Sequence, residues 1–510
     1  MAIAPTEEQK DIRDTSAGLT AGRHLKVCAF AGSGKSTTLK IVAGAIPHRG
    51  CYLAFNKAIA DEAKRKLAAT RCSASTMHSL AYSALRDEIG SPVQLNARAF
   101  RDSGLAARFR IPRVPGWNDF RVGSAVARTL QAFCASADLN FDETHGREAL
   151  IASVGDPEMI RDKTRSEEAA ATIDALAPVL TAMARTWWDH CVREHSYSHD
   201  MYLKAIDLDE GLRRDAFRGF RYAMVDEAQD LNPVQRSILM KTGLSLIAVG
   251  DPYQQIYSWR GGENALDLLP GETKYLTASF RFGEDIAAQA RRILASRPDG
   301  GPSQRLVGAG NGDISTHKGA AAAIICRTNF GMIEEAINLA RKGISFHVDN
   351  MAGLLSDVRS AQALYDGRLQ DVASADLRPF ASWNELSDQA EEDGGALGRL
   401  VTIVEEGMVR EIERLGERQV ADPAGARVMV CTAHRSKGLE WPAVKLGGDW
   451  KDIATMEARY RKSRKMSAGH QTLAIEEWNA LYVAATRPMT RLVGLDTLLE
   501  RDRAPAPQEP

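Results

Sequence analysis

The chain has 510 residues, of which 44% are hydrophobic, and it carries 65 lysines and arginines against 66 aspartates and glutamates. This length and apolar content suffice for several domains, and the balanced charge means that any polyanion must meet a local basic groove. No apolar run approaches the roughly 20 residues of a membrane-spanning helix, and residues 1–10 carry charges where a secretory signal needs an apolar stretch, so we expect a cytoplasmic protein with no membrane partner.

The first strong pattern along the chain is the glycine-rich stretch VCAFAGSGKSTTLKI, residues 27–41. It joins an apolar run to a helical pattern, and such a loop surrounds a phosphate with backbone N–H groups while Lys35 reaches the outer phosphates and Ser36 holds Mg²⁺. Ala29 stands where the usual pattern has its first glycine. The residues predicted to bind ATP in this stretch are Gly32, Ser33, Gly34, Lys35, Ser36 and Thr37. Loops of this kind occur in proteins with many different activities, so the loop alone does not show what the energy of the bound nucleotide is used for.

The segments that follow alternate between strand and helix. GCYLAF (50–55) predicts a strand and the next twelve residues a helix, whereas RYAMVDEAQD (221–230) and LSLIAVGDP (244–252) predict buried strands that end in acidic residues. This alternation predicts a doubly wound parallel sheet, whose ligands bind at the carboxyl ends of the strands. Between residues 84 and 200 the pattern is mostly helical, which predicts an inserted helical subdomain.

A second α/β unit is predicted from about residue 275. AAAIICRTN (321–329) predicts a strand, the residues after it a helix closed by Gly343, and ISFHV another strand. The unit resumes at residue 426 and continues to about residue 499. The helical interval between them predicts a second, smaller insertion, on which we expect strand binding to depend little, and the proline-rich tail has the composition of disorder.

Two acidic residues end one of the predicted buried strands. Asp226 is expected to hold Mg²⁺, and Glu227 is expected to orient or deprotonate the attacking water. Without the phosphate loop this pair would be an ordinary acidic strand end. After the next strand, Gln254 can sense the terminal phosphate.

An aromatic pair follows Gln254 within a few residues. Tyr257 and Trp259, with Arg260 beside them, suit base stacking and phosphate contact on a single nucleic-acid strand. For an isolated pair, a place in the protein core is the alternative interpretation.

Eight motifs in order carry a family resemblance: AGSGKST, AFNKAIADEA, STMHSLAY, VDEAQD, VGDPYQQIYSWRG, SFRFGEDIA, TAHRSKGLEW and NALYVAATRP. In their order and spacing the chain resembles the UvrD/Rep-type helicases of superfamily one. Among these it looks most like the F-box DNA helicase branch, without an F-box extension, and the resemblance covers about residues 6–499. It implies an α/β fold of two RecA-like P-loop domains with helical insertions.

The pattern along the chain predicts the domain limits, and the resemblance implies further site residues. The first RecA-like domain comprises 1–83 and 201–274 with insertion 84–200, the second 275–360 and 426–499 with insertion 361–425, and the tail is 500–510. Gln9 would read the adenine, Arg281 and Arg487 would act as arginine fingers on the γ-phosphate, and Glu440 would approach the ribose or the phosphates. The residues implied to bind DNA are Phe55, Asn56, Thr76, His78, Tyr257, Trp259, Arg260, Arg327, Asn329, Thr432 and His434.

These inferences predict an ATP- and Mg²⁺-dependent DNA helicase that moves 3′ to 5′ on single strands as a monomer. The expected partners are single-stranded DNA and its junctions with duplex, with a recombinase or a nuclease as a candidate protein partner. One alternative is a translocase that strips proteins from DNA without unwinding it. Another is a binding module whose ATP site switches its affinity for a partner, against which the full catalytic set argues.

Two other patterns carry weaker signals. His195 and His199 have a spacing that could bind zinc on a helix, but no third partner lies nearby in the sequence, so a polar loop is the preferred interpretation. The basic run ARYRKSRK (458–465) is interpreted as a solvated loop, with a DNA contact as the alternative.

Overall fold

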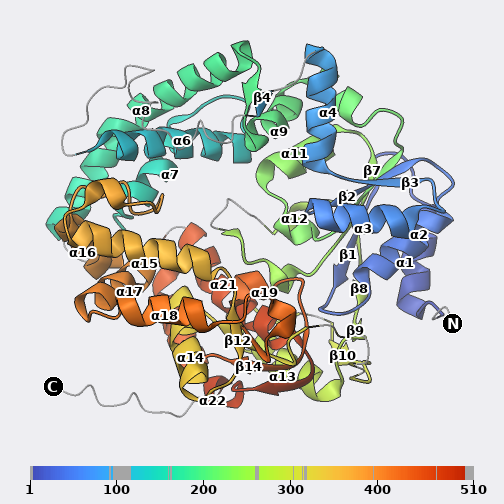
Figure 1. Cartoon of the computed structure of the whole chain (residues 1–510). Coiled ribbons are helices and arrows are strands. Elements are labelled where there is room, and N and C mark those ends of the chain that lie inside the picture. The colour runs from blue at the N-terminus through green and yellow to red at the C-terminus, as the bar shows by residue number, and fades with distance from the viewer. Residues whose placement is uncertain are drawn as a thin grey trace.

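The fold is seen in a computed structural model, whose described residues are 4–499 without 91–93, 96–116, 159, 161–162, 259–263, 303, 313, 315–316, 318, 394 and 467. Two parallel sheets flanked by helices form two lobes, here called lobe 1 and lobe 2 (Figure 1). Each lobe carries a helical insertion, called insertion 1 and insertion 2. Among the described residues, we find no helix that combines the length and the apolar character needed to cross a bilayer.

Lobe 1 is built on a six-stranded sheet in the order β3-β2-β6-β7-β1-β8, with every neighbouring pair parallel. Strands β2, β6 and β7 are buried along their whole length, as expected for central parallel strands covered on both faces. The elements of lobe 1 are α1 (Glu7–Ala17), β1 (His24–Ala29), α2 (Lys35–Ala45), β2 (Gly50–Ala54), α3 (Lys57–Leu67), β3 (Cys72–Thr76), α4 (Met77–Ile89), β6 (Tyr222–Val225), η1 (Ala228–Asp230), α11 (Pro233–Lys241), β7 (Ser245–Gly250), η2 (Pro252–Gln254), α12 (Ala265–Leu268) and β8 (Glu272–Leu276).

Insertion 1 lies between α4 and β6 and is mostly helical, as predicted. Its residues Leu130, Leu180 and Trp187 share one buried cluster with Leu53 and Leu246 of the lobe 1 strands, so the insertion is fixed to lobe 1 by a common core. Its elements are β4 (Gln94–Leu95), α6 (Asp119–Ala135), α7 (Glu143–Val154), α8 (Lys163–Arg193), β5 (Ser196–Tyr197), α9 (His199–Leu208) and α10 (Glu210–Ala216).

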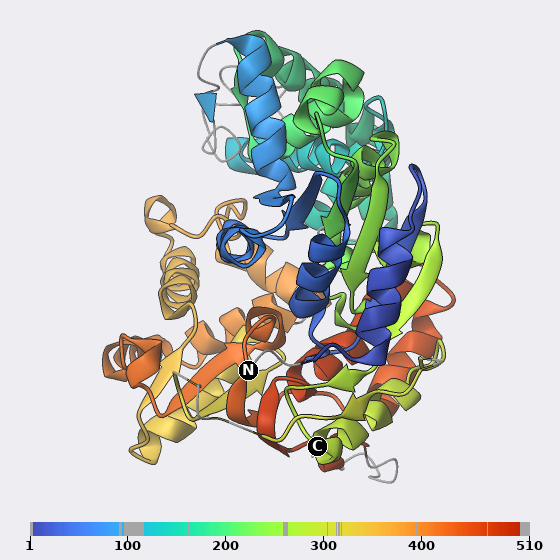
Figure 2. The same cartoon turned by 90° about the vertical axis from the view of Figure 1, so that its right-hand side faces the viewer.

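Lobe 2 is built on a five-stranded parallel sheet in the order β12-β13-β11-β14-β15. Figure 2 shows insertion 1 at the top, lobe 1 in the middle and lobe 2 at the bottom. The elements of lobe 2 are β9 (Ala278–Ser279), α13 (Glu284–Ala295), β10 (Val307–Gly308), β11 (Ala322–Cys326), α14 (Asn329–Arg341), β12 (Phe346–Val348), β13 (Val428–Thr432), α19 (Ala433–Ser436), β14 (Trp441–Leu446), α20 (Ile453–Ser463), α21 (Ala468–Ala485), β15 (Pro488–Val493) and α22 (Asp496–Leu499).

Insertion 2 meets insertion 1 on one side of the molecule (Figure 1). Arg121 of α6 forms an ion pair with Glu385, and Arg165 of α8 lies 3.6 Å from Asp388. Its elements are α15 (Met351–Tyr365), η4 (Leu369–Asp371), α16 (Trp383–Asp393), α17 (Gly395–Glu405), α18 (Val409–Arg418) and η5 (Pro423–Gly425). The two insertions therefore touch each other as well as their own lobes.

Four of the predicted domain boundaries need correction. Helix α4 continues across the boundary at 83/84, α9 across 200/201 and α15 across 360/361, and β8, which spans 274/275, belongs to the lobe 1 sheet, where it pairs with β1. At these points a single helix or strand runs through the predicted boundary, so the hydrophobic periodicity of the sequence does not change there. The sequence therefore carries no local signal for the change of domain.

Helix α18 of insertion 2 belongs to the core of lobe 2. Ile412 is fully buried in a cluster that includes Ile324 of β11 and Val430 of β13. We expect Ile412→Ala to lower the free energy of unfolding by about 2–5 kcal/mol, because it leaves a cavity in that core. Chemical denaturation measures the loss, and Arg414→Ala on the exposed side of the same helix is the matched control. Equal stability of the two variants would contradict this packing.

Candidate nucleotide site and nucleic-acid surface

A cavity of about 810 Å³ opens between the two lobes. Its wall includes the phosphate-loop residues, with Gly32 and Gly34 at φ of 73° and 81°, a backbone conformation that favours glycine. Gly34 precedes α2 and offers no side chain to cap that helix, so the first N–H groups of α2 are left for a ligand. A Cβ atom at Gly32 would lie 2.6 Å from the Ser279 hydroxyl oxygen, so only glycine fits there. This geometry fits a bound phosphate group.

The acidic pair lies at the carboxyl end of β6, across from the phosphate loop. Asp226 accepts a hydrogen bond from the Tyr52 hydroxyl, and the Glu227 carboxylate lies 3.6 Å from the Lys35 ammonium. Burial and the neighbouring Glu227 raise the pKa of Asp226. Burial acts in the same direction on Glu227, but the positive charges of Lys35 and Lys437 outweigh it and lower the pKa of Glu227. Glu227 is therefore the more acidic carboxyl group of the pair.

Two arginines reach the cavity from lobe 2. Arg487 is only 2% exposed, and its guanidinium donates to the Gln254 side chain of lobe 1 over 3.2 Å. Burial and the nearby Arg281 lower the pKa of Arg487 to about 9. Arg281 donates to the Glu440 carboxylate over 2.7 Å and to the carbonyl oxygen of Thr486. Four of the side chains that the sequence linked to this site line the same cavity: Gln254, Arg281, Glu440 and Arg487.

Sequence reasoning missed a lysine in the same cavity. Lys437 of lobe 2 forms an ion pair with Asp230 and donates to the Gln254 carbonyl oxygen over 2.8 Å. It is thus a second contact from lobe 2 to the residues around Glu227. The signal for it was present, because Lys437 lies inside the motif TAHRSKGLEW, between His434 and Glu440.

Helix α21 of lobe 2 was missed as a contact between the lobes. The Tyr482 hydroxyl lies 3.2 Å from an oxygen of Asp251 and accepts a bond from the Ala31 N–H in the phosphate loop. Asn479 donates to the Gln255 carbonyl oxygen over 2.7 Å. Only the packing of α21 on the strand ends of lobe 1 brings these groups together.

Two further residues bear on base recognition. Gln9 is buried, donates to the Thr38 hydroxyl over 3.1 Å and is not among the residues that line the cavity. Phe280, which sequence reasoning did not single out, lines the cavity, is 47% exposed and lies close to Gly34. The exposed ring of Phe280, next to Arg281 in the sequence, is suited to stack on a planar base.

Three of the predicted strand-binding residues form a row of rings across the lobes. Phe55 of lobe 1 is 48% exposed, and its ring lies parallel to that of Tyr257 with centroids 6.3 Å apart. The Tyr257 ring is 6.0 Å from the His434 ring of lobe 2, and its hydroxyl donates to the His434 carbonyl oxygen. Asn56, next to Phe55, caps α3 through its side chain. Flat rings in a row that crosses both lobes suit successive bases of one strand.

Other predicted strand-binding residues lie elsewhere or are engaged within the protein. Arg327 forms two hydrogen bonds with the Glu477 carboxylate, at 2.8 and 2.9 Å, so a phosphate would compete with that carboxylate. Thr76 caps α4. His78 packs edge-on against the Tyr202 ring, 5.9 Å away, and burial lowers its pKa to about 4.

The remaining strand-binding predictions divide into exposed, buried and undescribed residues. Asn329 is exposed at the start of α14, whereas Thr432 is buried at the end of β13. Trp259 and Arg260 lie outside the described residues.

The structure also shows where the two weaker sequence patterns lie. His195 lies beyond the end of α8 and His199 begins α9, so the pair does not share a helix, and His199 is hydrogen-bonded to Tyr202. The interpretation of the basic run 458–465 as a loop was wrong, because most of it forms the last turns of α20. Its positive charges in the last turn stabilise the helix, because they lie near the negative pole of the helix dipole.

Comparison with known proteins accounts for both lobes. Residues 11–268 match the model of the UvrD/REP helicase N-terminal domain, and residues 277–494 match that of the UvrD-like helicase C-terminal domain. The chain belongs to the UvrD/Rep helicase family. The resemblance read from its motifs is thereby confirmed, as is the α/β fold of two helicase domains.

Two of the relatives of this UvrD/Rep family member match nearly all of it, and a third matches just over half. F-box DNA helicase 1 of Gallus gallus is 29% identical over 94% of this chain and 48% of its own length. F-box DNA helicase protein 1 of Schizosaccharomyces pombe is 28% identical over 97% of this chain and 57% of its own length. ATP-dependent DNA helicase UvrD2 of Mycobacterium tuberculosis is 25% identical over 56% of this chain and 49% of its own length. The chain thus spans about half the length of the curated relatives it matches.

Proposed function

We propose that this chain is an ATP-driven motor that moves 3′ to 5′ on single-stranded DNA and separates duplex. The observation that carries the proposal is the composite cavity, in which Lys35 and Glu227 of lobe 1 face Arg281 and Arg487 of lobe 2. Positive groups of one lobe can stabilise charge on a phosphate held by the other, so that bound nucleotide and closure of the lobes are linked. The names of the relatives, which are DNA helicases, support the choice of substrate.

The residues of the cavity fit ATP with Mg²⁺. In the proposed arrangement the first N–H groups of α2 and the Lys35 ammonium hold the phosphates, and Ser36 and Asp226 hold the metal ion. Glu227, beside Lys35, is proposed to orient the attacking water and to accept its proton. The bound ion supplies positive charge close to the phosphates. Gln9 and Glu440 are proposed to help recognise the adenine and the ribose.

Lobe movement is transmitted to the strand through groups that already connect the two sites. Gln254 touches Arg487 and Lys437 on the nucleotide side, and Tyr257, three residues later, lies in the row of rings with Phe55 and His434. A change in how Arg487 holds Gln254 therefore shifts the segment that carries Tyr257. Alternate tightening of the grips of the two lobes on a strand would move the protein along it.

The decisive experiment measures ATP turnover with and without single-stranded DNA or RNA, followed by strand displacement on forked duplexes. A motor of the proposed kind shows turnover stimulated by single-stranded DNA and opens a fork with a 3′ tail but not one with a 5′ tail. Stimulated turnover without displacement would favour a translocase that clears proteins from DNA. Turnover that is slow and indifferent to either nucleic acid would favour an ATP-switched binding module and overturn the proposal.

Two phenylalanines with nearly equal exposure provide a matched test of the strand and base assignments. Phe55→Ala removes a stack worth about 1–3 kcal/mol, so the single-strand concentration that half-saturates ATP turnover should rise about tenfold or more. Both rings line the cavity, but Phe280 lies close to Gly34 of the phosphate loop, so Phe280→Ala should instead raise the KM for ATP and leave strand affinity unchanged. Steady-state ATPase assays with each ligand varied in turn measure both. The reverse pattern, or equal effects of the two variants on strand affinity, would reject the assignments.

A further inference from the structure

A cluster of three side chains, of types that can bind metal ions, lies between insertion 1 and lobe 2, apart from the nucleotide cavity. Asp156 and Glu158 follow the end of α7, where Gly155 at φ 86° turns the chain out of the helix. His470 lies in the first turn of α21, more than 300 residues later in the sequence. The cluster therefore joins two parts of the molecule that are far apart in the sequence.

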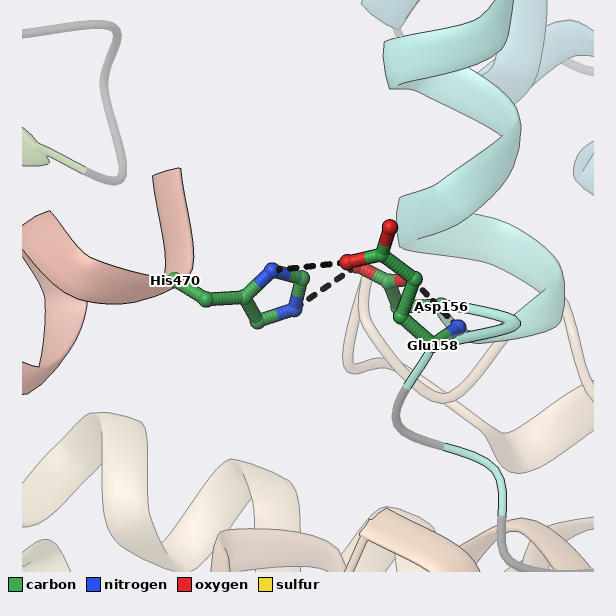
Figure 3. Close-up of side chains that lie close together, drawn as sticks. All are labelled: Asp156, Glu158 and His470. Carbon is green, nitrogen blue, oxygen red and sulfur yellow. Dashed lines mark hydrogen bonds and ion pairs between the residues drawn. The ribbon is translucent and has the colours of Figure 1, made fainter. Parts of the chain in front are cut away.

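Both carboxylates approach one imidazole. Nε2 of His470 lies 3.0 Å from an oxygen of Asp156, and Nδ1 lies 3.4 Å from an oxygen of Glu158 (Figure 3). The side chains of His470 and Asp156 are 13% and 23% exposed, whereas Glu158 is 53% exposed. The cluster is thus enclosed on the histidine side and open to water at Glu158.

We propose that Asp156, Glu158 and His470 bind a divalent transition metal ion of the zinc class. One imidazole nitrogen and two carboxylate oxygens are a ligand set that Zn²⁺ takes in proteins, with water in the remaining position. The three ligand atoms lie within 4.8 Å of one another. Ligand atoms in a tetrahedral zinc site are separated by roughly 3.4 Å. Asp156 and Glu158 now meet different nitrogens of the ring, so to close the site around an ion on Nε2 the half-exposed Glu158 has to rotate toward that nitrogen.

The charges at the cluster favour a cation. A neutral imidazole has a single N–H and can donate to only one of two carboxylates, while the two negative charges repel each other. A metal ion between them relieves this repulsion, and so does a second proton on His470. The choice between an ion and a proton is what the experiment has to decide.

A bound ion would fasten insertion 1 to lobe 2. Asp156 and Glu158 belong to the subdomain that shares a core with lobe 1, whereas His470 begins the helix whose Asn479 and Tyr482 contact the strand ends of lobe 1. The ion would therefore stabilise the assembled arrangement of the lobes. Metal binding itself does not depend on the proposed motor function.

The test is a titration of the full-length chain with Zn²⁺ by isothermal calorimetry, after removal of metal by a chelator and dialysis, without nucleotide or DNA. We expect one equivalent to bind and to raise the thermal unfolding temperature. Asp156→Asn and His470→Ala should each weaken binding at least about tenfold, the smallest loss typical even for a residue that only supports a metal ligand. Glu158→Gln, at a half-exposed position, provides a variant with little risk to folding.

Insertion 1 offers a matched control in a second histidine–aspartate pair. Asp138 lies 3.0 Å from the His145 ring, so Asp138→Asn removes a carboxylate from an imidazole without touching the cluster. This variant should bind Zn²⁺ as the unmodified chain does. If Asp156→Asn, Glu158→Gln and His470→Ala also bind Zn²⁺ unchanged, or if the unmodified chain binds none, the cluster is an ion pair of a protonated imidazole and the proposal is overturned.

Discussion

Replacing Arg281 by alanine is expected to lower the turnover of ATP by about 10³- to 10⁵-fold, although this residue lies far from the phosphate loop in the sequence. The side chain faces the cavity between the lobes and is held there by Glu440 and the Thr486 carbonyl oxygen. Under the proposed mechanism, this arginine stabilises charge that develops on the phosphate held by lobe 1. Because Arg281 is not part of the apolar core, the folded state should persist, and steady-state ATPase assays at saturating DNA measure the loss.

Arg487→Ala should have an effect of the same order, with an added cost in stability. Its buried guanidinium holds Gln254 and the Val483 carbonyl oxygen, so thermal unfolding must be recorded with turnover. Arg292→Ala is the matched control, because Arg292 lies in the same lobe and pairs with Asp496 on the surface. Near-normal turnover of a folded Arg281→Ala or Arg487→Ala protein would remove that arginine from the active site.

Glu227→Gln is expected to lower ATP turnover by about 10²- to 10⁴-fold while ATP binding is kept. The Glu227 carboxylate lies 3.6 Å from the Lys35 ammonium, so under the proposed mechanism its loss removes the base and frees Lys35 to meet the phosphates. Lys35→Ala should lower both turnover and binding, because in the proposed arrangement the ammonium itself contacts the nucleotide. Binding of a non-hydrolysable ATP analogue and single-turnover hydrolysis separate the two effects.

The comparison of these two variants also tests the division of roles. Equal loss of binding in Glu227→Gln and Lys35→Ala would mean that Glu227 contacts the bound nucleotide rather than the water. Glu62→Gln, on the exposed face of α3 in the same lobe, should leave both binding and turnover as they are.

The sequence alone predicted the position of those candidate site residues that depend on a single stretch of chain. The phosphate loop follows β1, in which buried and half-buried residues alternate, and Asp226 and Glu227 follow the fully buried β6. Parallel strands place their carboxyl ends at one edge of a sheet, so residues at the ends of different strands meet there whatever their separation in sequence. The order of the motifs then identified the family, which the matches to both helicase domains confirm.

Only the tertiary structure decided which partners many of the other side chains have. Arg327 has the type and position of a strand contact, but the fold sets Glu477 against it, and α18 belongs to the lobe 2 core although its sequence predicts only an inserted helix. Lys437 reaches Asp230, and His470 reaches Asp156, only because the lobes pack together. Local periodicity fixes which face of a helix or strand is apolar, but the neighbour of a polar side chain depends on how separate elements pack.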